Sequence, residues 1–124
     1  MDLQPIQRPD QMMIQGYGKG GFRVSDRVHQ GSVIVTETRV LPWSIKAIGD
    51  LDEASFDDLI AAGPLPEVIL LGCGDRMALI PSALKKALRA KGLVIDPMDT
   101  GAACRTFNIL LSEDRRVAAC LVAI

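Results

Sequence analysis

The segment from Met98 to Asn108 (MDTGAACRTFN) carries the residue types of this chain that are best suited to chemistry. A thiol, Cys104, stands next to a cation, Arg105, shortly after a predicted helix start at Asp99 and Thr100. A helix N-terminus and a nearby cation both stabilise a thiolate, which is the reactive form of cysteine. However, the dipole effect fades beyond the first turn, and adjacent helical residues do not face each other. The sequence therefore favours a packed Cys104 over a catalytic one, and helix capping is the first role expected of Asp99 and Thr100.

Arg105 and Asn108 are three residues apart, which places both side chains on one face of the predicted helix. The Arg105 guanidinium has the geometry to bind a carboxylate of a ligand or of a partner. The alternative is an internal ion pair, for which Asp75 and Asp96 are the candidate acids.

A second motif, Gly72-Cys73-Gly74, follows an apolar run and precedes another predicted helix. In open α/β sheets, ligands bind at the carboxyl ends of strands, and glycines let the backbone approach a ligand closely. The motif lacks the third glycine of a dinucleotide fingerprint and the Lys-Ser/Thr of a phosphate loop. A tight strand-to-helix turn is the simpler interpretation.

Together the two segments support one hypothesis, a small-molecule or anion site, or an enzyme site, between the Gly72–Asp75 loop and the Thr100–Arg105 helix start. Arg105 would bind the anion, and Cys73 or Cys104 would be the reactive group. The residues assigned to this site are Gly72, Cys73, Gly74, Asp99, Thr100, Cys104, Arg105 and Asn108.

Other reactive groups are sparse in the sequence. The three cysteines form no CxxC pair, and His29 is the single histidine and is expected in a turn, so a zinc ligand set is not apparent. The sequence also offers no paired base and nucleophile and no cofactor fingerprint. We therefore expect no metal, no cofactor and no catalytic residues, and a non-catalytic role is favoured over an enzyme.

The favoured hypothesis is a non-catalytic protein-interaction domain. The sequence is 48% hydrophobic but only 4% aromatic, and its mean hydropathy is +0.22. A small domain with this much apolar sequence can cover some of it with a partner, either another protein or a second copy of itself. The residues predicted for partner contact are Tyr17, Phe22 and Trp43.

A chain of 124 residues predicts one domain, here residues 12–124 after a flexible arm at residues 1–11. The first third reads as β hairpins with turns at Gly18–Gly21 and Ser25-Asp26. The rest alternates between helical patterns and apolar runs, which predicts crossover units. The buried strands are expected at 33–36, 68–71, 93–95 and 117–122, and the helices at about 50–62, 81–91 and 100–111.

Charge and hydropathy limit the partners. The 14 basic and 15 acidic residues argue against broad electrostatic binding of nucleic acid or of an anionic membrane. No apolar run approaches the roughly 20 residues that span a bilayer, and the first residues lack the apolar stretch of a secretory signal. We expect a cytoplasmic protein with no transmembrane segment and no nucleic-acid partner.

Several motifs occur in an order that resembles a known family. They are Ile14–Gly18, Gly21–Val24, Gly31–Val33, Trp43, Leu70–Gly74, Met98–Asn108 and Arg116–Ala119. Over about residues 12–122 the chain resembles a small bacterial and archaeal domain family of unknown function, whose mitochondrial relative is an assembly factor for respiratory complex I, the NADH:ubiquinone oxidoreductase. Phe107 stands where tyrosine is usual in this family, and Asp96-Pro97 stands where a glutamate and an aliphatic residue are expected.

The resemblance implies an α/β fold of three layers (β+α/β/α), in which the N-terminal hairpins form an extra layer beside a central mixed sheet. It implies that the last strand is antiparallel to its neighbours, whereas the residues alone would make it parallel. It supplies no catalytic residues. It implies a role in protein assembly, with a respiratory complex subunit as the partner and a location at the periphery of the inner membrane.

Overall fold

A computed structural model describes residues 12–124, and the arm predicted for residues 1–11 lies outside this range. The N-terminal hairpins form a small antiparallel sheet in the order β1-β2-β3. Its strands are β1 (Ile14–Gly18), β2 (Gly21–Val24) and β3 (Arg27–Gln30). Both predicted turns are confirmed, with positive φ at Lys19 and Gly20 and again at Ser25 and Asp26. Paired positive φ values give the two-residue turn whose twist matches its strands. His29, expected in a turn, lies within β3.

The central sheet is mixed and has the order β5-β4-β8-β6-β7. Its strands are β4 (Val33–Val35), β5 (Val40–Pro42), β6 (Val68–Gly72), β7 (Ile95–Met98) and β8 (Val117–Leu121). The predicted buried runs lie side by side in this sheet, as β4, β8, β6 and β7. The N-terminal strands therefore form a separate sheet, which is not hydrogen-bonded into the central one.

The last strand, β8, is antiparallel to β4 but parallel to β6. The expectation that it opposes its neighbours is thus correct for β4 and wrong for β6. The reason is the connection: between β6 and β8 the chain forms a helix, then β7, then a second helix. Each helix returns the chain to the edge where the previous strand began, which makes successive strands parallel.

Helical segments cover the two faces of the central sheet. They are the 3-10 turns η1 (Ile48–Asp50) and η2 (Glu53–Phe56) and the helices α1 (Asp57–Ala61), α2 (Ser82–Ala90) and α3 (Thr100–Ser112). The helix expected at 50–62 is thus broken into three short pieces. Asp52 starts a new turn there, because its side chain accepts a hydrogen bond from the Ser55 amide.

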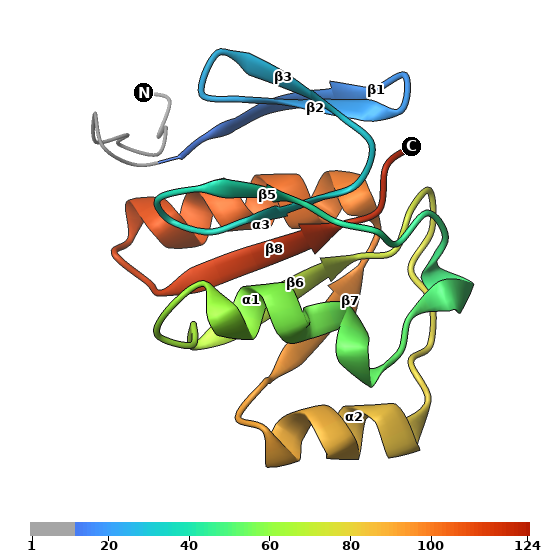
Figure 1. Ribbon diagram of the computed structural model, residues 1–124. Helices are drawn as coiled ribbons and strands as arrows, with labels where there is room; N and C mark the ends of the chain where they lie inside the picture. Colours follow the sequence, from blue (N-terminus) through green and yellow to red (C-terminus); the bar gives the residue numbers. More distant parts are fainter. Residues whose placement is uncertain (1–11) are drawn as a thin grey trace.

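Three layers result, as expected (Figure 1). The small sheet and α3 lie on one face of the central sheet, and α1 and α2 lie on the other. Successive side chains of β6 point to opposite faces of the sheet. Leu70 packs towards α3, while Ile69 and Leu71 pack on the other side. Aliphatic side chains therefore fill two core clusters, one on each face of the sheet.

β7 begins two residues later than expected and continues through Pro97. Proline removes a backbone donor, so strands tolerate it at a sheet edge, and β7 is an edge strand. Leu93, predicted to start this strand, is instead buried in the core cluster on the α2 side. Within residues 12–124, no helix combines the length and apolar character needed to cross a membrane.

Candidate functional site

The two segments singled out in the sequence meet at one edge of the central sheet. β6 and β7 are parallel neighbours, so the residues after both strands lie at the same edge. The Cys73 amide donates to the Met98 carbonyl at 2.8 Å, and the Thr100 amide donates to the Gly74 carbonyl at 2.9 Å. The segments therefore contact each other directly through backbone hydrogen bonds.

Thr100 closes this junction. Its side chain is fully buried, and its hydroxyl accepts from the Gly74 amide at 2.9 Å and donates to the Val122 carbonyl at 2.8 Å. A Cβ atom at Gly72 would lie 3.0 Å from Thr100 Oγ1 and from Leu121 Cδ2, so a larger residue there would push these neighbours apart. Polar groups that a ligand would use at this point already bond each other.

The other residues assigned to the site also make contacts within the fold. The Asp99 carboxylate accepts from the Ala102 amide at 2.8 Å and caps α3, which is the role expected from the sequence. Cys73 is buried, with its thiol 3.6 Å from the Leu71 carbonyl. Within residues 12–124, no three His, Cys, Asp or Glu side chains gather where they could hold a metal ion.

Cys104 is a packed thiol in α3. Burial raises its pKa from 9.0 to about 12, the nearby Arg105 opposes this shift, and Asp99 adds to it. Burial also raises the pKa of the Cys120 thiol. The side chain of Cys104 is therefore a neutral, hydrophobic group at physiological pH, and not an activated nucleophile.

Cys104 is expected to resist alkylation in the folded protein. A thiol of pKa about 12 is ionised in about one molecule in ten thousand at pH 8, against about one in ten for an unfolded thiol. Mass spectrometry after iodoacetamide treatment, with and without urea, measures this difference. The neutral thiol stabilises the fold fully below about pH 9, and this contribution is lost as the pH rises towards 12, because the folded-state pKa is the higher one. Rapid labelling of Cys104 in the native protein would contradict this assignment.

Asn108 connects α3 to the first strand. Its side-chain carbonyl accepts from the Ile14 amide at 2.9 Å, and its amide group donates to the Ile14 carbonyl at 2.8 Å. The side chain thus bonds β1 as a neighbouring strand would. Arg105, on the same face, donates to the Tyr17 hydroxyl at 3.4 Å and forms no ion pair with Asp75 or Asp96.

Gly101 allows this docking of β1 on α3. A Cβ atom there would lie 2.9 Å from Tyr17 Cζ, so the tyrosine ring occupies the space that a side chain would need. The close approach at Gly101 is therefore made by a side chain and not by another backbone. Tyr17 itself remains 43% exposed.

Phe22 and Trp43 are core residues, which corrects the expectation of a shared aromatic contact surface with Tyr17. Phe22 is 1% exposed and packs between the small sheet and α3, while Trp43 is 6% exposed on the opposite face of the central sheet. The indole N–H of Trp43 donates to the Ser55 carbonyl at 2.7 Å, which holds the ring inside the fold. A role in partner contact stays a prediction for Tyr17 alone.

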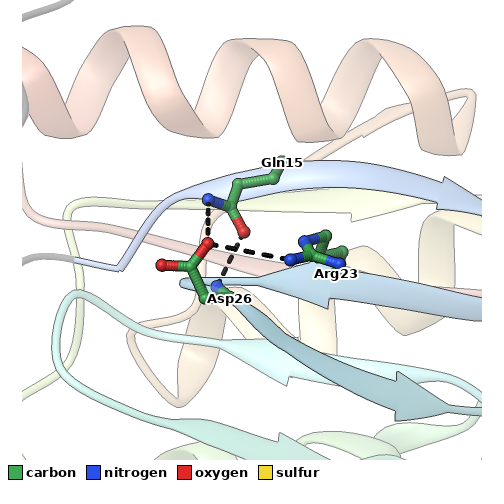
Figure 2. Close-up of polar contacts among 3 residues, drawn as sticks. All are labelled: Gln15, Arg23 and Asp26. Carbon is green, nitrogen blue, oxygen red and sulfur yellow. Dashed lines mark hydrogen bonds and ion pairs between the residues drawn. The ribbon is translucent and has the colours of Figure 1, made fainter.

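The outer face of the small sheet has a surface feature that the sequence reasoning missed. It is an open hollow of about 290 Å³ above the glycines of β1 and β2, beside Val28 and Arg23. At one end of this face, the Asp26 carboxylate accepts a hydrogen bond from the Gln15 side-chain Nε2 at 3.0 Å and lies 3.9 Å from the Arg23 guanidinium (Figure 2). Glycines spaced by two residues in β1 were the available signal, since they share one face of a strand.

Comparisons with known proteins place the chain among relatives. The family model described as "Protein of unknown function (DUF498/DUF598)" matches residues 14–122. An uncharacterized protein of Rhodobacter capsulatus is 38% identical over 112 residues, which cover 88% of this chain and 82% of that protein. NADH dehydrogenase [ubiquinone] 1 alpha subcomplex assembly factor 3 is 32% identical in Xenopus tropicalis and 31% identical in Homo sapiens. These two matches cover 90% of this chain but only 61% and 60% of the assembly factors.

Solved structures share the fold. A crystal structure of a protein from Bordetella parapertussis superposes with a TM-score of 0.83 at 28% identity, covering 95% of this chain and 100% of that one. The crystal structure of an outer membrane protein from Bartonella henselae has a TM-score of 0.81 at 37% identity, covering 93% and 97%. A Mth938-like domain from Bordetella pertussis has a TM-score of 0.79 at 26% identity, covering 98% and 92%. The family match spans almost all of the described residues, and the chain belongs to the family of proteins of unknown function DUF498/DUF598.

Proposed function

We propose that this chain is a non-catalytic protein-interaction domain that assists the assembly of a respiratory membrane complex. The observation that carries the proposal is the similarity to NADH dehydrogenase assembly factor 3 over 90% of the chain. Since the chain spans about 60% of those proteins, the proposal concerns the domain they share with it. Its partner would be a subunit of the NADH:quinone oxidoreductase of its host, bound from the cytoplasm at the inner membrane.

The geometry of the Met98–Asn108 block supports a scaffold role. Its polar side chains hold parts of this chain together: Thr100 joins a loop to the end of β8, and Asn108 joins α3 to β1. Its thiol, Cys104, is kept neutral by burial. The alternative of an anion site between the two segments gains no support, because the Gly74 amide is already bonded to Thr100.

Deletion of the gene in its own host tests this proposal. We expect less assembled NADH:quinone oxidoreductase on blue-native gels, with unchanged synthesis of its subunits, and recovery when the wild-type chain is restored. Cys104→Ala should restore assembly as well as the wild type does, since no reaction uses the thiol. Arg105→Gln removes the side chain that would bind an anion in the ligand-site alternative. If assembly needs no such site, this variant should also restore it. A fully assembled complex in the deletion strain would overturn the proposal.

A further inference from the structure

The outer face of the small sheet is unusual for a face exposed to water. Side chains alternate along β2, so Phe22 and Val24 face α3 while Gly21 and Arg23 face outwards. A solvated sheet face normally carries polar side chains. The residues on this outer face are Gly16, Gly18, Gly21, Arg23, Val28 and Gln30, which pair across the three strands. Three of the six have no side chain, and Val28 is 63% exposed.

Gly16 follows an irregularity in β1, where the register with β2 shifts between Ile14 and Gly16, but this bulge does not itself require a glycine. The φ of Gly16 lies outside the left-handed region, and a Cβ atom there would meet nothing within 4 Å. Gly21 differs, because a Cβ there would lie 2.7 Å from the His29 carbonyl oxygen. Glycine inside a strand weakens the strand, and it often marks a bulge or a place where a ligand or another backbone comes close. Gly16 thus keeps open a space that this chain does not fill.

The size and charge of the hollow indicate what fits it. Its volume of about 290 Å³ lies at the lower limit of small-molecule pockets, which begin at roughly 300 Å³, and suits one large side chain. Lys19 and Arg23 line it, whereas Arg27 pairs with Val24 and so belongs to the opposite face of the small sheet. The hollow is thus lined by two basic side chains, with the Asp26 carboxylate 3.9 Å from the Arg23 guanidinium, although the whole chain has a net charge of -1. The complementary surface is therefore acidic.

We propose that this hollow docks a partner protein through one bulky apolar side chain that is flanked by acidic residues. The proposal names the contact surface of the interaction domain and so rests on the proposed function. Lipid headgroups fit less well, because polybasic membrane sites cluster about 4–8 Lys and Arg residues, and the small sheet has three.

The probe is an acetylated, amidated pentapeptide with a central phenylalanine and two acidic residues on each side. Titrated into the isotope-labelled full chain, it should shift the amide resonances of Gly16, Gly18 and Gly21 in a saturable manner. Gly16→Val should fill the hollow and raise the Kd for the peptide at least about tenfold. The fold tolerates this change, since the Cβ meets open space, and the urea midpoint should stay equal or rise.

Gly49→Val is the matched control, because Gly49 is exposed and equally open but lies in η1. It should leave the Kd unchanged. The double variant Lys19→Gln, Arg23→Gln should weaken binding without filling the hollow, and added salt should do the same. Absence of saturable shifts, or equal binding by Gly16→Val, would overturn the proposal. So would glycine shifts that appear only with anionic vesicles, or that depend on protein concentration without peptide, since these indicate a lipid surface or a second copy.

Complementation in the host separates this proposal from the broader one. If the deletion reduces assembly and Gly16→Val fails to restore it while Gly49→Val succeeds, both proposals stand. If both variants restore assembly, the docking surface is wrong but the assembly role remains. If the deletion has no effect, the assembly role is wrong, and peptide binding alone decides the surface.

Discussion

Replacement of Trp43 by alanine is expected to lower the free energy of unfolding by about 3–5 kcal/mol. The indole is 6% exposed in the core cluster beneath the central sheet, where its ring centroid lies 6.1 Å from that of Phe56. Alanine would leave a cavity there, and the Ser55 carbonyl would lose its hydrogen-bond donor. Both effects act in the folded state, so loss of partner binding by this variant would report unfolding and not a lost contact.

Urea unfolding followed by far-UV circular dichroism measures this loss as a lower midpoint. Trp43→Phe is the control, since it keeps an aromatic ring and removes the N–H, and it should cost clearly less. At this chain length each kcal/mol shifts the Tm by roughly 3–6 °C, so the alanine variant should melt at least about 10 °C lower. A Trp43→Ala protein as stable as the wild type would show that the ring is not packed as described.

Thr100→Val is expected to cost about 2–4 kcal/mol, although valine has nearly the same shape as threonine. The hydroxyl has two buried partners, the Gly74 amide and the Val122 carbonyl. Each buried group left without a partner costs about 1–3 kcal/mol. The loop after β6 would also lose its link to α3, so the Gly74 amide should exchange with solvent faster.

Thr100→Ser separates the hydroxyl from the methyl group. Serine keeps both hydrogen bonds, so it should retain slow exchange at Gly74 while losing some packing. Denaturant curves and amide exchange on the same three proteins make the comparison. Equal stability of Thr100→Val and the wild type would mean that the hydroxyl does not join these segments.

Strong local signals made much of the fold predictable. Val68–Leu71 is a continuous apolar run, which fits a strand covered on both faces, and the structure places it inside the sheet, between β8 and β7. Glycines and short polar residues marked the two hairpin turns, where the structure has positive φ. The orientation of β8 was harder to predict, because it depends on connections between distant segments. The break in the helix at Asp52 was not predicted either, because the apolar residues follow a helical pattern through it while the local cap at Asp52 starts a new turn.

The sequence predicted where the two segments of the candidate site meet, but not whether their polar groups are open to a ligand. Two strands that end at one edge bring Gly74 and Thr100 together, and topology alone was enough to indicate this. Whether their polar atoms would face a ligand or each other depends on packing within an ångström, which a sequence does not specify. The burial of Trp43 likewise depends on the path of a loop that places the Ser55 carbonyl near its ring.

The link between Asn108 and Ile14 joins residues 94 positions apart, and this sets an order on synthesis. The hairpins leave the ribosome first, yet their apolar side has nothing to cover it until α3 has been translated. β4 likewise waits for β8, the last strand of the chain. Contacts of such long range slow folding and leave nascent apolar surface exposed for longer. The hairpins and β4 therefore gain their packing partners only after α3 and β8 have been synthesised.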